Sequence, residues 1–486
     1  MQKLQAIVLA AGKSIRFKTG KSKLLERICG QEMITYPIKV LSQLNIDITT
    51  VVGYEKEKIQ EILQTASNTY IQFITQEKQL GTGHALKCTK QLWNKEYILV
   101  LNGDIPLITK DIIKKLYDKH IETKAAISFV IAHNPDPSMK SYGRIVKTQN
   151  TIQIVEARHF SGDTHEHCCI NAGIYIISKD FLLKSIDDIE ENRSVKEFYL
   201  TDLIKIASDH NKTISTLSAP FDRIRGVNTH EELWAVEQIQ RSDLVRYWME
   251  RGVRFSVAQN VHVDLDITIG SGTYIGCGIH LLKGTTIGSN CIVEEFTSLE
   301  SVILGNNVRV KPFCVIKNSI IENDTVVGPF AHIKENTTIG QASIIGNFVE
   351  VTRSTIGANT KAKHLTYIGD ATIGNNVNIG AGTIFCNHNG TTKNKTVVKD
   401  GSYIGSNNTL LAPITVEKNA FTAAGSVITN TVPENALAIA RNRQINKEGY
   451  AQKLREKYTH ESQSDKKDSL SFTGAKKTNL KNSAAY

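Results

Sequence analysis

The second half of the 486-residue chain repeats with a period of six. Aliphatic–glycine pairs recur there, most of them six residues or a multiple of six apart: Ile269-Gly270, Ile275-Gly276, Ile287-Gly288, Ile339-Gly340, Ile345-Gly346, Ile373-Gly374 and Ile379-Gly380. This period is typical of a left-handed parallel β-helix, in which each six-residue rung turns one aliphatic side chain inward. We expect glycine or asparagine at the corners, where φ is positive.

The first half alternates between strand-like and helix-like segments. Apolar runs at residues 6–11, 48–53 and 97–101 indicate buried strands, and residues 55–65 and 109–119 have helical patterns. This alternation predicts an α/β, Rossmann-like domain with a mainly parallel sheet and helices on both faces. Ligands of such sheets bind beyond the carboxyl ends of the strands.

These changes of pattern divide the chain into four segments. We predict an α/β domain over residues 1–228, a linker helix over 229–251 and the left-handed β-helix of hexapeptide repeats over 252–445. Residues 446–486 form a C-terminal segment whose polar tail, beyond about Tyr458, is expected to be disordered.

Composition narrows the choice of partners. The formal net charge of +10 suits anionic ligands. No aromatic residues alternate with a basic stretch and no DNA-binding motif is present, so phosphorylated small molecules are favoured over nucleic acid. The eight cysteines have no zinc spacing, the N-terminal apolar run is too short for a signal peptide, and no run approaches the roughly 20 apolar residues of a membrane span. We expect a cytoplasmic protein without membrane insertion.

A loop of small residues follows the first predicted strand, over residues 9–16. Its Gly-Lys-Ser string suggests a P-loop, but that motif needs a glycine where this chain has Ile7. The small residues allow the backbone to approach a nucleotide, while Arg16 and Lys23 can neutralise phosphate charge. Taken by itself, the loop is explained equally well as a strand-to-helix turn with two solvated cations.

Two further segments favour nucleotide chemistry. Residues 76–85 combine an amide with a Gly-Thr-Gly run, which suits hydrogen bonding to the edge of a base. Asp104 follows an apolar strand, so its carboxylate is expected at the carboxyl end, and Asn228 offers a second oxygen. Mg²⁺ favours one or two such oxygens together with substrate phosphates and water.

These motifs together resemble those of the sugar nucleotidyltransferases. With the repeats included, residues from about 4 to 450 resemble the bacterial family of bifunctional N-acetylglucosamine-1-phosphate uridyltransferases and glucosamine-1-phosphate acetyltransferases. The resemblance implies synthesis of UDP-N-acetylglucosamine for the cell wall: acetyl transfer from acetyl-CoA to glucosamine-1-phosphate, then uridylyl transfer from UTP with release of pyrophosphate. It also implies Mg²⁺ as cofactor and a homotrimer with sites between subunits.

In the first domain, the resemblance implies that Arg16 and Lys23 hold phosphates as catalytic residues, and that Asp104 and Asn228 ligate Mg²⁺. No side-chain nucleophile is needed, because the sugar phosphate attacks the α-phosphorus in line. The residues implied to bind UTP or the sugar are Leu9, Ala10, Ala11, Gly12, Lys23, Gln76, Gly81, Thr82, Asn102, Gly103, Asp104, Gly143, Glu156, Asn171 and Asn228.

In the β-helix, the resemblance implies that His364 is the general base for the amine proton and that Glu350 orients it. Without the surrounding motif, His364 is better explained as a structural residue of a rung. The residues implied to bind glucosamine-1-phosphate are Lys334, Thr352, Tyr367 and Asn378. Those implied to bind acetyl-CoA are Ala381, Asn387, His388, Lys393, Ser406, Ala424 and Arg441.

The first domain departs from the family pattern at three places. Ser14 stands where the family has glycine, Ser22 stands for a proline, and residues 157–160 are unusual. The backbone N–H of Ser14 can still meet a phosphate, so we expect tuned activity rather than its loss.

The departures in the second half affect charge. Lys334 and Thr352 stand where the family has an arginine and a lysine, and His388 replaces a tyrosine. Lys334 lacks the bidentate fork of arginine. Arg353 is expected to be a poor substitute, because neighbouring residues of a strand point to opposite faces. We therefore expect a working acetyltransferase with weak binding of the sugar phosphate.

Three other functions fit parts of the pattern. The chain could be a uridyltransferase whose degenerate β-helix serves only trimerisation, or an ADP- or GDP-sugar pyrophosphorylase with regulatory repeats. A non-catalytic assembly subunit is the third, but a scaffold has no need for metal ligands together with phosphate-binding cations.

Overall fold

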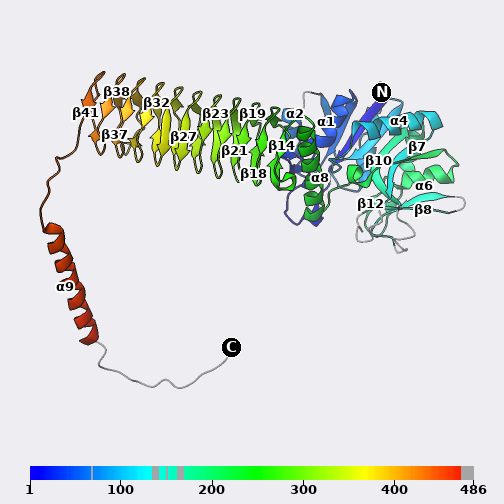
Figure 1. The fold of residues 1–486 in the computed structure, drawn as a ribbon. Helices are drawn as coiled ribbons and strands as arrows, with labels where there is room; N and C mark the ends of the chain where they lie inside the picture. The colour runs from blue at the N-terminus through cyan, green and yellow to red at the C-terminus, as the bar shows by residue number, and fades with distance from the viewer. Residues whose placement is uncertain (67–68, 134–141, 149–150, 161–168, 472–486) are drawn as a thin grey trace.

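The structure, a computed structural model, describes residues 1–66, 69–133, 142–148, 151–160 and 169–471. Figure 1 shows an α/β unit at one end, a long stack of β-coils extending from it, and a C-terminal helix that stands away from the coils. The predicted fold class, an α/β Rossmann-like domain followed by a left-handed parallel β-helix, is confirmed.

The α/β unit is built on a nine-stranded sheet whose main path is β13-β7-β10-β6-β1-β4-β5. β1 pairs in parallel with β4 and β6, as the buried apolar runs predicted. β10, however, is antiparallel to both β6 and β7, so the sheet is mixed. Its strands are β1 Leu4–Ala10, β4 Asp47–Val52, β5 Ile71–Thr75, β6 Tyr97–Asn102, β7 Ile127–His133, β8 Arg144–Lys147, β9 Ile152–Val155, β10 Cys169–Ser178 and β13 Ile214–Ser218. Two short hairpins lie outside it: β2 Arg27–Ile28 with β3 Gln31–Glu32, and β11 Glu191–Asn192 with β12 Glu197–Phe198.

Helices cover both faces of this sheet, as predicted. Residues of α1, α2 and α4 share one apolar core with one face of β1, and residues of α3, α5 and α6 share a second core with the other face. The burial of both faces explains the nearly continuous apolar runs of the central strands. The helices of the unit are α1 Thr35–Gln43, α2 Lys56–Ala66, α3 Thr82–Lys87, α4 Lys110–Thr123, α5 Lys179–Ser185, α6 Asp202–Asp209 and α7 Phe221–Ile224.

Helix α8 (His230–Met249) connects the two units. It begins with a capping box, in which Thr229 accepts from the backbone of Glu232 and the Glu232 side chain accepts in return. Val236 packs into a core of the α/β unit, whereas Val245 and Trp248 pack into the β-helix core. One helix therefore contributes to both cores.

The β-coils form two long sheets, and all their paired strands run parallel. Contacts between successive coils join residues 17 or 18 apart, and the offset grows to 25 where an irregular loop is inserted. The first sheet contains β14 Arg254–Phe255, β17 Tyr274–Ile275, β20 Ile292–Val293, β22 Arg309–Val310, β24 Val326–Val327, β27 Ile344–Asn347, β30 Lys361–His364, β33 Asn378–Ile379, β36 Tyr403–Ile404, β39 Phe421–Thr422 and β41 Leu437–Ala438. The second contains β15 Val261–Val263, β16 Thr268–Ile269, β18 Ile279–Leu282, β19 Thr286–Ile287, β21 Ser298–Leu304, β23 Val315–Ile321, β25 His332–Lys334, β26 Thr337–Ile339, β28 Glu350–Thr352, β29 Thr355–Ile356, β31 Tyr367–Gly369, β32 Ala371–Ile373, β34 Ile384–Cys386, β35 Thr396–Val398, β37 Thr409–Leu411, β38 Ile414–Val416 and β40 Val427–Ile428.

Positive φ at corners is confirmed for asparagines and for glycines such as Gly272, but the glycines of the aliphatic–glycine pairs have a different role. Positive φ occurs at the asparagines that follow them, such as Asn290 and Asn307, and not at Gly288 itself. A methyl group on Gly288 would lie 2.4 Å from the carbonyl oxygen of Gly305 on the next coil. The glycine is therefore required for the close stacking of coils, and the asparagine for the turn.

The C-terminal segment also differs from its expectation. The coils end at β41, and helix α9 (Tyr450–Ser471) continues past the point where disorder was predicted. The remainder of the predicted tail, residues 472–486, lies outside the described residues. Within the described ranges, no helix combines the length and apolar character that crossing a membrane requires.

Candidate active sites

Four side chains predicted to bind phosphates and metal meet at the edge of the first sheet. The Lys23 ammonium donates to Asp104 Oδ2 at 2.5 Å and to Asn228 Oδ1 at 2.8 Å. The Arg16 guanidinium donates to the same Asn228 oxygen at 2.7 Å, although these two residues are 212 apart in the chain. We call Arg16, Lys23, Asp104 and Asn228 the charged cluster. The sequence predicted their convergence, and the structure brings all four together.

The backbone explains this convergence. The strands β1 and β6 are adjacent and parallel, so the loop after β1 and Asp104 after β6 leave the sheet at the same edge. The N–H of Val227 donates to the carbonyl of Asp104 at 3.0 Å, which fixes the segment that carries Asn228. Ser14 adopts φ +54°, and its hydroxyl accepts from the N–H of Lys23 at 3.0 Å. The serine that departs from the family pattern thus stabilises the loop.

The other residues predicted to bind the nucleotide along these two strands share this edge. The N–H of Gly103 donates to the carbonyl of Leu9 at 2.9 Å, and Leu9 pairs with Asn102 across the strands. The residues on this edge are Leu9, Ala10, Ala11, Gly12, Asn102 and Gly103.

The charged cluster has a donor set that fits a magnesium ion. The Asp104 carboxylate and the Asn228 amide oxygen both point at one cation, the ammonium of Lys23. A carboxylate and an amide oxygen are ligands that Mg²⁺ accepts, and the remaining positions are normally filled by substrate phosphates and water. In the part of the chain that the structure describes, no group of three or more His, Cys, Asp or Glu could hold a metal. The two oxygens of the cluster fit the small number of protein ligands that Mg²⁺ takes.

The segment predicted to recognise the base is held by internal hydrogen bonds. Gln76 is buried, and its amide donates to the carbonyl of Gly81 at 3.0 Å and to Nδ1 of His84 at 2.9 Å. Thr82 accepts from the N–H of Leu200 at 3.1 Å. Burial lowers the pKa of His84, and its Nδ1 accepts the hydrogen bond from Gln76. Sequence reasoning gave His84 no role, although it follows directly on the Gly-Thr-Gly run.

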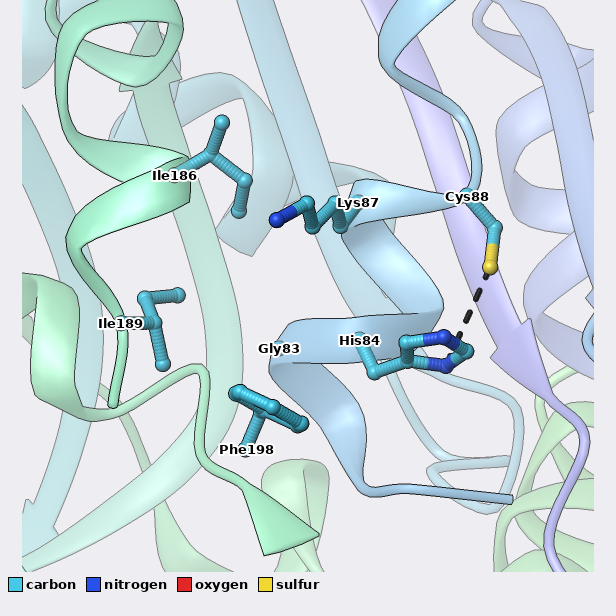
Figure 2. A pocket seen from close by; sticks show the side chains of 7 residues that line it. All are labelled: Gly83, His84, Lys87, Cys88, Ile186, Ile189 and Phe198. Atoms are coloured by element: carbon cyan, nitrogen blue, oxygen red, sulfur yellow. Dashed lines mark hydrogen bonds between the residues drawn. The ribbon is translucent and has the colours of Figure 1, made fainter. Parts of the chain in front are cut away.

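A cavity of about 340 Å³ opens beside α3, next to this segment (Figure 2). In Figure 2 the apolar side chains and Lys87 surround the cavity, and His84 is joined to Cys88 by a contact of 3.9 Å. Its lining consists of Gly83, His84, Lys87, Cys88, Ile186, Ile189 and Phe198. These are not the residues predicted to bind UTP, so the cavity lies beside the predicted nucleotide site.

The residues predicted for the sugar also lie together. The N–H of Asn171 donates to the carbonyl of Gly143 at 2.9 Å, and its amide donates to the hydroxyl of Tyr175 at 2.6 Å. Glu156 accepts from the Thr201 hydroxyl at 2.8 Å, and burial raises the pKa of the Glu156 carboxyl. Glu156 is close to Gly143, since a methyl group added to Gly143 would lie 3.9 Å from Cα of Glu156. The structure therefore brings these predicted sugar residues together.

The residues of the second predicted site lie on both sheets of the β-helix. His364 ends β30, and its Nδ1 lies 2.7 Å from the amide oxygen of Asn347 on the preceding coil. Glu350, the predicted partner of His364, instead forms an ion pair of 3.0 Å with the ammonium of Lys334. A nearby cation thus attracts the Glu350 carboxylate, and the role of Glu350 in orienting His364 stays a prediction. Sequence reasoning missed Asn347.

Arg353 is engaged by acidic side chains. Its guanidinium donates to both oxygens of Asp370 at 2.8 and 3.0 Å, and also to Glu335. These bonds lower the pKa of both carboxyls. Thr352 lies beside the group, with its hydroxyl 3.1 Å from Glu335 and 3.1 Å from Arg353. The expected strand alternation does not apply, because Arg353 occupies a corner with φ +48°. Its guanidinium is engaged by these two carboxyls, and its weakness as a phosphate ligand stays a prediction.

Tyr367 and Asn378 are the remaining residues predicted for the sugar phosphate. The Asn387 amide donates to Asp370 at 2.5 Å and to the Tyr367 hydroxyl at 3.4 Å. Asn378 pairs with Lys361 across neighbouring coils and helps to line an open groove of about 620 Å³. Tyr367 and Asn378 thus come from different faces of the coil.

Most residues predicted for acetyl-CoA lie in the last coils. The loop after Asn387 closes through a bridge between His388 and Lys393. The carbonyl of Ala381 accepts from Asn407 at 2.7 Å, and that of Ser406 accepts from Gly425 at 2.8 Å, which stacks Ala381, Ser406 and Ala424 on successive turns. Arg441 follows β41.

Comparison with known proteins matches one transferase family to each half of the chain. The family described as "MobA-like NTP transferase domain" matches residues 6–175, and "Bacterial transferase hexapeptide (six repeats)" matches residues 318–353. The "Bifunctional protein GlmU" of Clostridium kluyveri is 42% identical over 455 residues, covering 92% of this chain and 98% of the relative. The proteins of that name from Clostridium botulinum (strain 657) and Exiguobacterium sibiricum are each 37% identical and also cover 92% of this chain.

The fold and the charged cluster define a nucleotidyltransferase joined to a hexapeptide-repeat transferase. Within that class, the chain belongs to the bifunctional GlmU family. This confirms the resemblance seen in the sequence, and it favours the bifunctional prediction over a uridyltransferase with a degenerate β-helix.

Proposed function

We propose that this chain makes UDP-N-acetylglucosamine from glucosamine-1-phosphate, acetyl-CoA and UTP in two steps. The charged cluster is the single observation that carries the proposal, since it unites two phosphate-binding cations with two metal-binding oxygens. A scaffold protein has no use for that combination.

In uridylyl transfer, the phosphate oxygen of N-acetylglucosamine-1-phosphate forms a bond to the α-phosphorus of UTP while the bond to pyrophosphate breaks. Arg16 and Lys23 bind the phosphates and neutralise the charge that moves to the leaving group. A magnesium ion, when bound by Asp104 and Asn228, adds charge neutralisation at the phosphates. Gly143, Glu156 and Asn171 hold the sugar in line.

In acetyl transfer, the amine of glucosamine-1-phosphate attacks the thioester carbon of acetyl-CoA. Nε2 of His364 takes the amine proton, and the sulfur of CoA leaves with the electron pair of the broken bond. Lys334, Tyr367 and Asn378 bind the sugar phosphate, while the stacked loops after Ala381 and Ser406 bind CoA.

We also propose that the protein acts as a homotrimer in the cytoplasm. Phe296, Phe313, Phe330 and Phe348 stack along one corner of the β-helix with centroids 5.4, 5.0 and 5.2 Å apart, and each ring is about half exposed. Leu365, beside His364, continues this row. An exposed apolar row of this length is suited to packing against a second copy, which would approach the acetyl-transfer site.

One pair of assays tests the proposal on the full chain. Pyrophosphate release from UTP and N-acetylglucosamine-1-phosphate, with Mg²⁺, should report the first domain, and release of CoA thiol with glucosamine-1-phosphate should report the β-helix. A panel of UTP, ATP, GTP and CTP should show preference for UTP, and light scattering should give three times the chain mass.

Each alternative function predicts a different result. Pyrophosphate release without thiol release would indicate a uridyltransferase with a purely structural β-helix. Preference for ATP or GTP would indicate another sugar pyrophosphorylase. Absence of both activities would indicate an assembly subunit.

A further inference from the structure

We propose that Asn347, rather than Glu350, positions the imidazole of His364 for acetyl transfer. This inference rests on the proposed role of His364 as the general base. Asn347 does not touch the substrate in this scheme; it is a positioning residue that acts through the histidine.

Asn347 and His364 occupy the same position on successive coils. They pair directly across β27 and β30, and Nδ1 of His364 lies 2.7 Å from Oδ1 of Asn347. The residue after each one turns the corner with positive φ, Phe348 at +55° and Leu365 at +48°. The N–H of Leu365 also donates to the carbonyl of Asn347 at 3.0 Å. The two side chains are thus held in register by matched backbone on both coils.

The glycine before Asn347 brings the two coils close. A methyl group on Gly346 would lie 1.9 Å from the carbonyl oxygen of Lys363, so no larger residue fits without separating the strands. This spacing places the short amide of Asn347 within hydrogen-bond reach of the ring. A rigid contact of this kind fixes the orientation of the imidazole better than a partner on a flexible loop would.

The chemistry of the contact fits a general base. An amide oxygen only accepts hydrogen bonds, so the bonded Nδ1 must carry the proton. Nε2 is then left with its lone pair and can take the proton of the amine. Because the amide is neutral, it sets the tautomer of the ring without favouring the charged imidazolium. A carboxylate in its place would favour the imidazolium.

Glu350 is engaged elsewhere. It pairs with His332 and Tyr367 across its own sheet, and its carboxylate lies 3.0 Å from the ammonium of Lys334. Among the described residues, no hydrogen bond joins Glu350 to His364. Its position suits the predicted sugar-phosphate pocket, where its carboxylate offsets the positive charge of Lys334.

The test compares variants at Asn347 and Glu350 in the full chain, with uridylyl transfer measured in each sample as an internal control of folding. For Asn347→Ala we expect kcat of acetyl transfer to fall about tenfold to a hundredfold, with KM for acetyl-CoA little changed. For Asn347→Asp we expect the acidic limb of the pH–rate profile to move up by about one pH unit, because the new carboxylate stabilises the imidazolium, which cannot act as a base. Glu350→Gln should change KM for glucosamine-1-phosphate and leave the acidic limb of the pH–rate profile at the same pH.

His364→Ala separates the two levels of inference. If the parent chain shows no acetyl transfer, the proposed function of the β-helix is wrong. If the parent transfers acetyl and His364→Ala keeps that activity, His364 is not the general base, and the role of Asn347 is overturned with it. If His364→Ala loses acetyl transfer while Asn347→Ala stays within twofold of the parent and Asn347→Asp has an unshifted profile, only the role of Asn347 is overturned. A shift of the acidic limb in Glu350→Gln instead would assign the positioning role to Glu350.

Discussion

The two candidate sites are assembled in opposite ways. The charged cluster joins residues up to 212 apart in the sequence, through a loop, a strand end and the segment before α8. The β-helix site instead joins residues on neighbouring coils, with offsets of 17 residues between Asn347 and His364 and again between Arg353 and Asp370. The first site requires the whole α/β fold, whereas the second requires only the correct stacking of adjacent turns.

The balance of charge differs as well. In the charged cluster, Arg16 and Lys23 face a single carboxylate, so positive charge remains for phosphates. Near the predicted sugar-phosphate pocket, Lys334 is paired with Glu350, and Arg353 is shared between Glu335 and Asp370. Three carboxylates there outnumber two cations. One protein thus offers a cationic phosphate site and a site whose cations are already paired.

The largest expected effect separates the two sites. His364→Ala should lower acetyl transfer about 10²-fold to 10⁴-fold, the usual contribution of general-base catalysis, and leave uridylyl transfer unchanged. Paired kinetics on one preparation measure both rates. A matched control is His280→Ala, which changes an exposed histidine of the same β-helix outside the predicted site; an equal loss there would mean that the effect of His364→Ala is not specific to a general base.

The reciprocal variant acts on the charged cluster. Asp104→Ala should lower uridylyl transfer about 10²-fold to 10³-fold, because it removes a metal-binding oxygen and the partner of Lys23. Acetyl transfer should persist. Asp111→Ala, at an exposed carboxylate of α4 in the same unit, is the matched control. Retention of uridylyl transfer by Asp104→Ala would contradict the assigned role.

The α/β unit also contains a buried titratable group that makes its stability depend on pH. The ring of His120, in α4, is hydrogen-bonded to the hydroxyls of Ser128 in β7 and Ser178 in β10, and burial lowers its pKa to about 4. As the pH falls through about 6.5, His120 of the unfolded chain therefore binds a proton that His120 of the folded chain does not bind. The contribution of this histidine to stability is full above that pH and is lost below it. Between pH 7 and pH 5 the loss is about 2 kcal/mol.

Urea unfolding at these two pH values, followed through both activities, measures this difference. At pH 5, uridylyl transfer should be lost at lower urea than at pH 7, and His120→Gln should reduce the shift. His210→Gln, at an exposed histidine of the same unit, should leave the shift unchanged. An equal shift in His120→Gln and in the parent would exclude His120 as the source.

The sequence predicted both sites only in part, and for a physical reason. Motifs after strands fix where Asp104 and the loop of Arg16 leave the sheet, so the charged cluster could be predicted from the order of strands. Hydrogen-bond partners around a corner depend on side-chain direction and on competing charges. For that reason the sequence could not show that the carboxylate of Glu350 lies beside Lys334.

Sequence analysis gave no role to Asn347 or His84, and these two residues differ in how far their contacts could have been predicted from the sequence. Asn347 precedes His364 by one coil of 17 residues, a spacing that is visible once the coil length is known. The role of His84 depends on the fold of the Gly-Thr-Gly turn over buried Gln76, which no spacing rule reveals. The antiparallel β10 was likewise not visible, because strand direction leaves no trace in apolar patterning.

The smallest predicted effect probes the difference in charge directly. Thr352→Lys adds a cation beside the predicted sugar-phosphate pocket and should lower KM for glucosamine-1-phosphate about tenfold, the equivalent of about 1.4 kcal/mol of added binding. Thr352→Val, which removes only the hydroxyl bonded to Glu335, is the matched control and should not lower KM. If the lysine variant binds the sugar phosphate no better than the parent, while its kcat is retained, then the phosphate does not lie beside position 352. The acceptor would then be held by its sugar hydroxyls, and the paired cations of this corner would serve the stacking of the coils rather than the substrate.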